Sequence, residues 1–294
     1  MKKLRLHLLI ILGVYLICFI IGSFVDLKLM EALFSKNNGF GLTFAAIGTI
    51  PGYSVFAIIG GGFLWLGLQK SFKTSIRVIF FILMVVGLGC GIYFSGKEWF
   101  GENGFYNPKI YWVGFLITTP IMGGMFYLGY YLTSKANNPR IWILFVALTI
   151  AAFIALVGGV TLLKAIFHRP RYRELVSGGV VPFHDWWDRC SNYKDFVALG
   201  FSKEEFKSFP SGHSGGSLTS LYFLAFIPVF FKKSEKWHLL AIYSGVAWSL
   251  LVCFTRILVG AHFLSDVAMG GILSIGCLII ANEVVIRTKC IQQE

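Results

Sequence analysis

The sequence predicts an all-α protein, a polytopic bundle of about eight membrane-spanning helices. Of its 294 residues, 56% are hydrophobic and 17% aromatic, whereas only 14% are charged. A soluble domain is far less apolar than this. Several apolar runs approach the roughly 20 residues that a helix needs to cross a hydrocarbon core, and short polar loops separate them. Because only helices and closed barrels satisfy their backbone hydrogen bonds in lipid, these runs predict helices.

The apolar runs give the expected spans in chain order. The first run follows a basic N-terminus and resembles a signal peptide, but no small-x-small cleavage pattern closes it, so we expect an uncleaved span. The second run is the weakest, because Pro51 and several glycines interrupt it. No linker or repeat divides the chain. The eight expected spans are residues 7–25, 44–68, 76–95, 110–132, 141–163, 213–231, 238–256 and 263–286.

The distribution of Lys and Arg predicts the orientation of the bundle. Basic residues accumulate on the cytoplasmic side of membrane proteins. One set of alternating loops, which includes both termini, contains thirteen of them, whereas the short loops of the other set contain only Lys28, Lys36, Lys97 and Lys109. We therefore expect both termini in the cytoplasm. The thirteen are Lys2, Lys3, Arg5, Lys70, Lys73, Arg77, Lys135, Arg140, Lys232, Lys233, Lys236, Arg287 and Lys289.

Nucleic-acid binding and cysteine chemistry are not indicated. The net charge is +12, but no soluble stretch shows a Lys/Arg face interleaved with aromatic residues. The six cysteines are scattered, without the spacing of a disulfide framework or a zinc site. No carboxylate cluster of the kind that binds Mg²⁺ is visible, so we expect no metal and no cofactor.

The other nine basic residues all lie between Lys164 and Arg256, on the face assigned as extracytoplasmic. Four of the nine are in three polar segments, residues 164–172, 209–213 and 255–266. The segments share one membrane face, because they end or open the last four expected spans. A cluster of Lys, Arg, two His, one Asp and a helix N-terminus is suited to a compact polyanion such as phosphate.

Within these segments the pair His262 and Asp266 indicates chemistry most strongly. Residues four apart on a helix share one face, so the carboxylate can accept a hydrogen bond from one ring nitrogen and leave the other as nucleophile or base. The alternative for Asp266 is a helix-end carboxylate that meets the helix dipole or lipid headgroups. Ser211 is an N-cap candidate, and Gly212 allows backbone amides to approach an anion, although an ordinary helix cap explains both equally well.

The three segments resemble the signature motifs of the type 2 phosphatidic acid phosphatase superfamily. The first family motif is Lys, six residues and Arg-Pro, which Lys164 and Arg171 match. Residues 210–213 match the second, Pro-Ser-Gly-His. The third is Ser-Arg, five residues, His, three residues and Asp, which Arg256, His262 and Asp266 match. Thr255 replaces the Ser and Tyr172 the Pro, and Arg169-Pro170 is an alternative Arg-Pro pair two residues early.

The resemblance implies a phosphatase core with defined residue roles. His262 would attack phosphorus and form a phosphohistidine, Asp266 would support it, and His213 would protonate the leaving oxygen. The phosphate oxygens would be held by Lys164, Arg171, Ser211, Gly212 and Arg256. The resemblance covers roughly residues 141–294. Because membrane members of the family usually have six core helices, residues 1–140 are expected to contain spans partly additional to that core.

The expected substrate is a lipid phosphate or diphosphate at the outer face of the cell membrane. Undecaprenyl diphosphate, phosphatidate and phosphatidylglycerol phosphate all remain open. A lipid phosphotransferase would use the same phosphohistidine but would need an acceptor pocket. A noncatalytic lipid-binding protein or transporter would not need the His262/Asp266 pair. The aromatic loop of residues 182–188 is expected at the membrane interface, as a gate for lipid or as a cap without substrate contact.

Overall fold

The computed structural model describes residues 2–101, 107–136, 138–231 and 235–288. These residues form helices and loops without a β-strand. Seven helical segments among them are long and apolar enough to cross a membrane, which confirms the expected multi-pass helical bundle. The segments are α1 (Lys2–Leu33), α2 with α3 (Gly39–Ile47 and Ile50–Leu68), α4 (Thr74–Gly96), α5 (Tyr111–Lys135), α6 with its π-helical continuation η1 and α7 (Ile141–Phe153, Ile154–Thr161 and Leu162–Phe167), α13 (Glu235–Leu258) and α14 (Leu264–Arg287).

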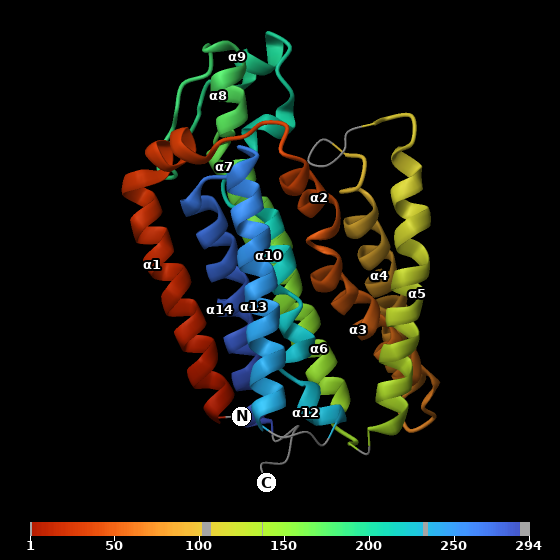
Figure 1. The fold of residues 1–294 in the computed structure, drawn as a ribbon. Coiled ribbons are helices and arrows are strands. Elements are labelled where there is room, and N and C mark those ends of the chain that lie inside the picture. Colours follow the sequence, from red (N-terminus) through yellow and green to blue (C-terminus); the bar gives the residue numbers. More distant parts are fainter. Residues whose placement is uncertain (1, 102–106, 137, 232–234, 289–294) are drawn as a thin grey trace.

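The sixth expected span, residues 213–231, is not one long helix. It consists of the short helices α10 (Gly212–Leu218), α11 (Leu221–Leu224) and α12 (Ile227–Phe230). Figure 1 shows α12 at the end of the bundle where α1 begins, with α10 further in, so the segment still runs along the bundle. At the break between α10 and α11, the hydroxyls of Ser217, Thr219 and Ser220 bond to carbonyls three residues earlier and compete with the helical hydrogen bonds. After the second break, Pro228 lies in the first turn of α12, a position that tolerates its missing amide.

Two other expected spans differ in detail from the prediction. The interruption of the second is confirmed, since α2 and α3 are separated by two residues and Pro51 lies at the start of α3. The first span is longer than expected. α1 continues eight residues beyond residue 25 and therefore includes Asp26, whose side chain is only 4% exposed.

The helices form two packed groups. α3, α4 and α5 pack against one another, and they lie on one side of the bundle in Figure 1. On the other side α1 packs along α14, while α10 contacts α13, α14 and α3. The backbones of α3 and α5 approach so closely that a Cβ atom on Gly129 would lie 1.9 Å from the carbonyl oxygen of Ile58. Such close approach through glycine is common between membrane helices.

A small cap covers one end of the bundle. It contains α8 (Tyr172–Gly178), α9 (Tyr193–Ala198) and the 3₁₀ helix η2 (Lys203–Phe206), around a core of Val181, Cys190, Phe196 and Phe206. Figure 1 shows α8 and α9 at the end opposite to the start of α1 and the end of α14. Among the basic residues assigned to the cytoplasm, Lys232, Lys233 and Lys289 lie outside the described residues.

Candidate active site

The three predicted segments meet directly below the cap. Residues 164–172 connect α7 to α8, residues 209–213 lead into α10, and residues 255–266 join α13 to α14. The two histidine rings face each other across this meeting point with centroids 6.5 Å apart. Every predicted polar group here except Lys164 is nearly or fully buried, and the side chains of Arg171, Arg256 and Asp266 are at most 2% exposed. The fold therefore concentrates charge where a membrane protein usually avoids it.

His262 is held by a backbone carbonyl rather than directly by Asp266. Its Nδ1 lies 2.7 Å from the carbonyl oxygen of Ser208, whereas the nearer carboxylate oxygen of Asp266 is 3.8 Å away. A carbonyl oxygen can only accept, so Nδ1 carries the proton and Nε2 keeps its lone pair. Burial holds the pKa of His262 well below its ordinary value, and the charges of Lys164 and Arg171 act in the same direction. The ring is therefore neutral at neutral pH.

Asp266 ties the three segments together. Its carboxylate accepts hydrogen bonds from Nη1 of Arg169 at 2.6 Å, from the backbone amide of Phe263 at 2.8 Å and from the hydroxyl of Ser208. The contact with Phe263 also caps the start of α14. Ser208 was not singled out from the sequence, although it contacts both His262 and Asp266. Asp266 thus fixes Ser208, which orients His262, and its carboxylate lies 3.8 Å from Nδ1 of His262.

The two candidate arginines have different surroundings. The guanidinium of Arg169 is enclosed, because besides Asp266 it bonds to Asp26 on α1 at 3.0 Å and to the carbonyl of His184 at 2.8 Å. It also lies 4.0 Å above the ring of Phe263. Asp26 was missed from the sequence because it appeared to follow the first span. With these bonds Arg169 braces the site and is not directed to a ligand.

Arg171 instead belongs to a cluster of cations. Its charge interacts with those of Lys164 and Arg256. Glu205 is the counter-charge, 3.9 Å from Arg171, and its two carboxylate oxygens accept hydrogen bonds from Nε and Nη2 of Arg173. Burial raises the pKa of Glu205, but the Arg173 hydrogen bond and the Arg171 charge outweigh it and lower the pKa overall. Glu205 therefore remains ionised at neutral pH.

The predicted cap residues lie beside this cation cluster. The Ser211 hydroxyl accepts from the backbone amide of Ser214 at 3.2 Å, so Ser211 is an N-cap. Its own amide donates to the carbonyl of Asp266 at 2.9 Å, which fixes α10 to α14. Lys164 is next to this turn, since a Cβ atom on Gly212 would lie 3.8 Å from its Nζ. The ammonium group and the first amides of α10 are thus close together.

His213 is held by residues that the sequence did not indicate. Its Nε2 donates to the carbonyl oxygen of Ala45 in α2 at 3.2 Å, and the carboxylate of Glu98 lies 3.5 Å from the same nitrogen. Glu98 follows α4 and was not singled out from the sequence. Contacts of this kind join residues more than 100 positions apart and leave no local pattern.

The aromatic loop of residues 182–188 packs onto the site. The indole nitrogen of Trp186 donates to the Ser23 hydroxyl of α1 at 2.8 Å, and its ring stacks on Phe209. The Arg169 guanidinium lies 5.5 Å from the ring of Phe183. The loop thus covers Arg169 and joins the cap to α1.

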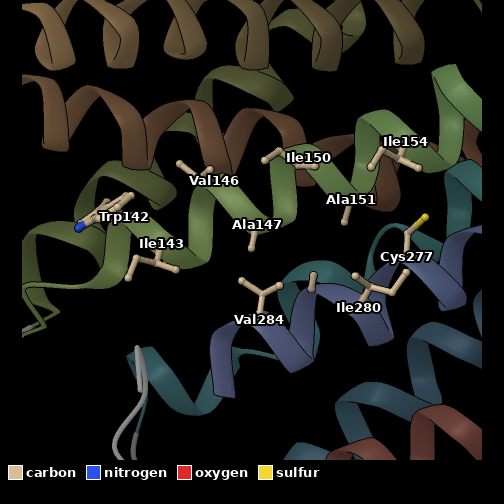
Figure 2. A pocket seen from close by; sticks show the side chains of 11 residues that line it. Trp142, Ile143, Val146, Ala147, Ile150, Ala151, Ile154, Cys277, Ile280 and Val284 are labelled. Atoms are coloured by element: carbon tan, nitrogen blue, oxygen red, sulfur yellow. The ribbon is translucent and has the colours of Figure 1, made fainter. Parts of the chain in front are cut away.

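A separate groove lies between α6 and α14, with a volume of about 200 Å³ (Figure 2). Figure 2 shows Ile150 and Ile154 on one wall and Ile280 and Val284 on the other. The lining carries no group suited to phosphate chemistry, so the groove is not part of the charged site. In the described residues no three His, Cys, Asp or Glu side chains gather to hold a metal ion.

Comparison with known proteins decides the family. Residues 140–289, about half of the chain, match the model of the PAP2 superfamily. The chain belongs to the PAP2 superfamily. This match confirms the resemblance seen in the three motifs, and all eight predicted site residues lie within it. Asp26, Ala45 and Glu98 lie outside the part that matches the PAP2 superfamily.

One similar curated protein carries a functional name. Probable lipid phosphate phosphatase 4 of Arabidopsis thaliana is 32% identical over 136 residues, which are 42% of this chain and 42% of that protein. The chain thus spans about two fifths of the length of the curated relative that it matches. No solved structure matches the chain.

Proposed function

We propose that the protein is a membrane phosphatase that hydrolyses the phosphate or diphosphate group of a lipid through a phosphohistidine at His262. The observation that carries the proposal is the state of His262. The Ser208 carbonyl fixes its proton on Nδ1, so a neutral Nε2 is available beside the cations Lys164, Arg171 and Arg256, of which the two arginines are buried. A nucleophile next to preformed positive charge is what phosphoryl transfer requires.

In the proposed reaction, Nε2 of His262 forms a bond to phosphorus while the bond to the leaving oxygen breaks. Lys164, Arg171, Arg256 and the turn of Ser211 and Gly212 neutralise the nonbridging oxygens. His213 gives a proton to the leaving oxygen. Water then attacks phosphorus, the N–P bond breaks and His213 regains a proton. Asp266 stays ionised and stabilises the His262 ring as it becomes positively charged.

A lipid substrate in the cell membrane is favoured by position and charge. The site lies at one end of an apolar bundle, at the level expected for lipid headgroups. Of the thirteen Lys and Arg residues assigned to the cytoplasm, those that the structure describes lie at the opposite end of the bundle. This supports cytoplasmic termini and an extracytoplasmic site. The name of the Arabidopsis relative favours a lipid phosphate as well. Undecaprenyl diphosphate or a phosphatidate-type lipid is our leading candidate.

Phosphate release from a panel of detergent-solubilised lipids tests the proposal. His262→Ala should abolish release while the protein remains folded and inserted, because the nucleophile is lost but the packing of the helices is kept. Residual activity above a few per cent would contradict the nucleophile assignment. Wild-type activity should persist in excess EDTA and be inhibited by vanadate. Loss of activity on chelation would instead reveal a required metal ion.

A further inference from the structure

Glu98 is a buried carboxylate beside His213 and lies outside the segment that matches the family model. Only 7% of the residue is exposed, and its Oε2 lies 3.5 Å from Nε2 of His213. The other carboxylate oxygen is 3.6 Å from Nζ of Lys97, whose ammonium lies 5.2 Å above the ring of Phe94. The Glu98 carboxylate is therefore positioned between a lysine on one side and His213 on the other.

The bond to Ala45 determines which His213 proton can be transferred. Nε2 of His213 points to the carbonyl oxygen of Ala45 at 3.2 Å, and a carbonyl can only accept. Nε2 thus keeps its proton whether the ring is neutral or charged. The proton that reaches the leaving oxygen must come from Nδ1. His213 therefore has to be an imidazolium, protonated on both nitrogens, before it acts.

An imidazolium at this position needs a counter-charge. Arg256, Lys164 and Arg171 all exert positive potential on the ring, and burial also disfavours its charged form. The Ala45 carbonyl contributes only a partial negative charge. Glu98 is the carboxylate found within 4 Å of this ring among the described residues. An anion at that distance favours the charged form of a histidine.

We propose that Glu98 is a positioning residue that orients His213 and stabilises its imidazolium, so that Nδ1 can donate a proton to the leaving oxygen. This inference rests on the proposed phosphatase function. As the bond between phosphorus and the leaving oxygen breaks, that oxygen takes the proton and the N–H electron pair stays on Nδ1. The neutral ring is later reprotonated by the water that attacks the phosphohistidine. Glu98 takes no part in the proton transfer itself.

A competing role for Glu98 is charge balance for the phosphate-binding cations, since its charge also acts on Lys164, Arg171 and Arg256. The two roles give different kinetics. Loss of charge balance changes phosphate binding and therefore affects all substrates alike. Loss of acid catalysis affects mainly substrates with a poor leaving group, because a lipid alkoxide needs the proton far more than nitrophenolate does.

The experiment compares kcat/KM for phosphatidate and 4-nitrophenyl phosphate, since this ratio includes the step in which the leaving group departs. His213→Ala should lose about 10²–10⁴-fold on phosphatidate and much less on 4-nitrophenyl phosphate. Glu98→Gln should show the same selectivity, with a loss of about tenfold or more on phosphatidate. In the His213→Ala background, Glu98→Gln should cause no further loss. The matched control is Glu31→Gln, which removes an exposed carboxylate in the last turn of α1 and should behave as wild type.

Equal losses on both substrates, or an undiminished Glu98→Gln effect without His213, would overturn the inference. Inhibition by inorganic phosphate should be unchanged in Glu98→Gln, whereas a shift would support the charge-balance role instead. Should Glu98→Gln fail to fold, Glu98→Asp retains the charge with a shorter reach. It should then give a smaller loss that is still confined to phosphatidate. If wild-type protein released phosphate from neither substrate, the proposed function would be wrong, which is distinct from failure of the Glu98 assignment.

Discussion

Arg169 and Arg171 are two positions apart in the chain, yet one stabilises the structure and the other faces the cation cluster. Both are buried, with 1% of each residue exposed. The Arg169 guanidinium is shared between Asp26 and Asp266, at 3.0 and 2.6 Å. A lysine at either position retains the charge but cannot make two directed contacts with one planar group. Arg169→Lys and Arg171→Lys therefore distinguish a structural role from a role in binding phosphate oxygens.

We predict that Arg169→Lys lowers the free energy of unfolding by on the order of 3 kcal/mol, because a lysine cannot pair with both buried carboxylates and one of them loses its cation. Arg171→Lys should leave stability nearly unchanged and weaken inhibition by vanadate, since the fork that binds oxygens is lost. Thermal unfolding in detergent and vanadate inhibition are the two measurements. A stable Arg169→Lys protein with weakened vanadate binding would reverse the assignment and make Arg169 the arginine of the first motif.

The sequence indicated the side chains of the site better than their supports. Spacing alone favoured Arg171 over Arg169, and that choice stays a prediction that the two Arg→Lys variants test. The acceptor for His262 could not be predicted, because it is the backbone carbonyl of Ser208 and any residue offers a carbonyl. Asp26 and Glu98 were also out of reach. Asp26 is 143 positions from Arg169, and Glu98 is 115 positions from His213. A single sequence carries no signal for such pairs.

α1 is attached to α14 by both charge and close packing. Asp26 bonds to the Ser265 amide at 3.0 Å as well as to Arg169. One turn earlier, Gly22 lies against the start of α14, where an added Cβ would be 2.6 Å from the Ser265 nitrogen. On the same helix, a Cβ on Gly13 would meet no atom within 4 Å. The two glycines are thus a matched pair for testing this contact.

We predict that Gly22→Ala separates α1 from α14, lowers the melting temperature and reduces activity, because Asp26 is pulled away from Arg169. A clash with backbone atoms cannot be relieved by a side-chain rotation, so we expect the free energy of unfolding to fall by about 1–3 kcal/mol. Gly13→Ala should be neutral or slightly stabilising. Equal melting temperatures of Gly22→Ala and Gly13→Ala in detergent would show that the close approach at Gly22 is not required for stability.

Hydropathy located the helices well but not their ends or breaks. A window of about 19 residues averages over single polar groups. It therefore ended the first span near residue 25, although α1 runs to Leu33 because Asp26 is neutralised by a partner from another segment. The same averaging hid the break between α10 and α11, where individual hydroxyl-to-carbonyl bonds compete with the helix, and the break between α11 and α12, which Pro228 follows.

The proposed orientation of the whole bundle can be tested with impermeant thiol reagents on intact cells. Lys203 in the cap and Lys73 at the start of α4 are both exposed and lie at opposite ends of the bundle. We predict that Lys203→Cys is labelled from outside and Lys73→Cys only after permeabilisation. The native Cys190 should contribute little, since it is fully buried and burial raises its pKa to about 11. The reverse labelling pattern would place the site in the cytoplasm.

The contact between Arg169 and Asp26 also has consequences for truncated and chimaeric forms of the protein. The catalytic motifs all lie after residue 140, but their bracing partners Asp26 and Ala45 belong to the earlier helices. A fragment starting at residue 141 would retain His262, the proposed nucleophile, and lose Asp26, one of the two carboxylates that pair with Arg169. Chimaeras that exchange residues 1–140 would keep all three motifs but would surround them with different partners in place of Asp26 and Ala45. Mutations in helices without any motif can therefore tune this site, and a search restricted to the motif-bearing half would overlook them.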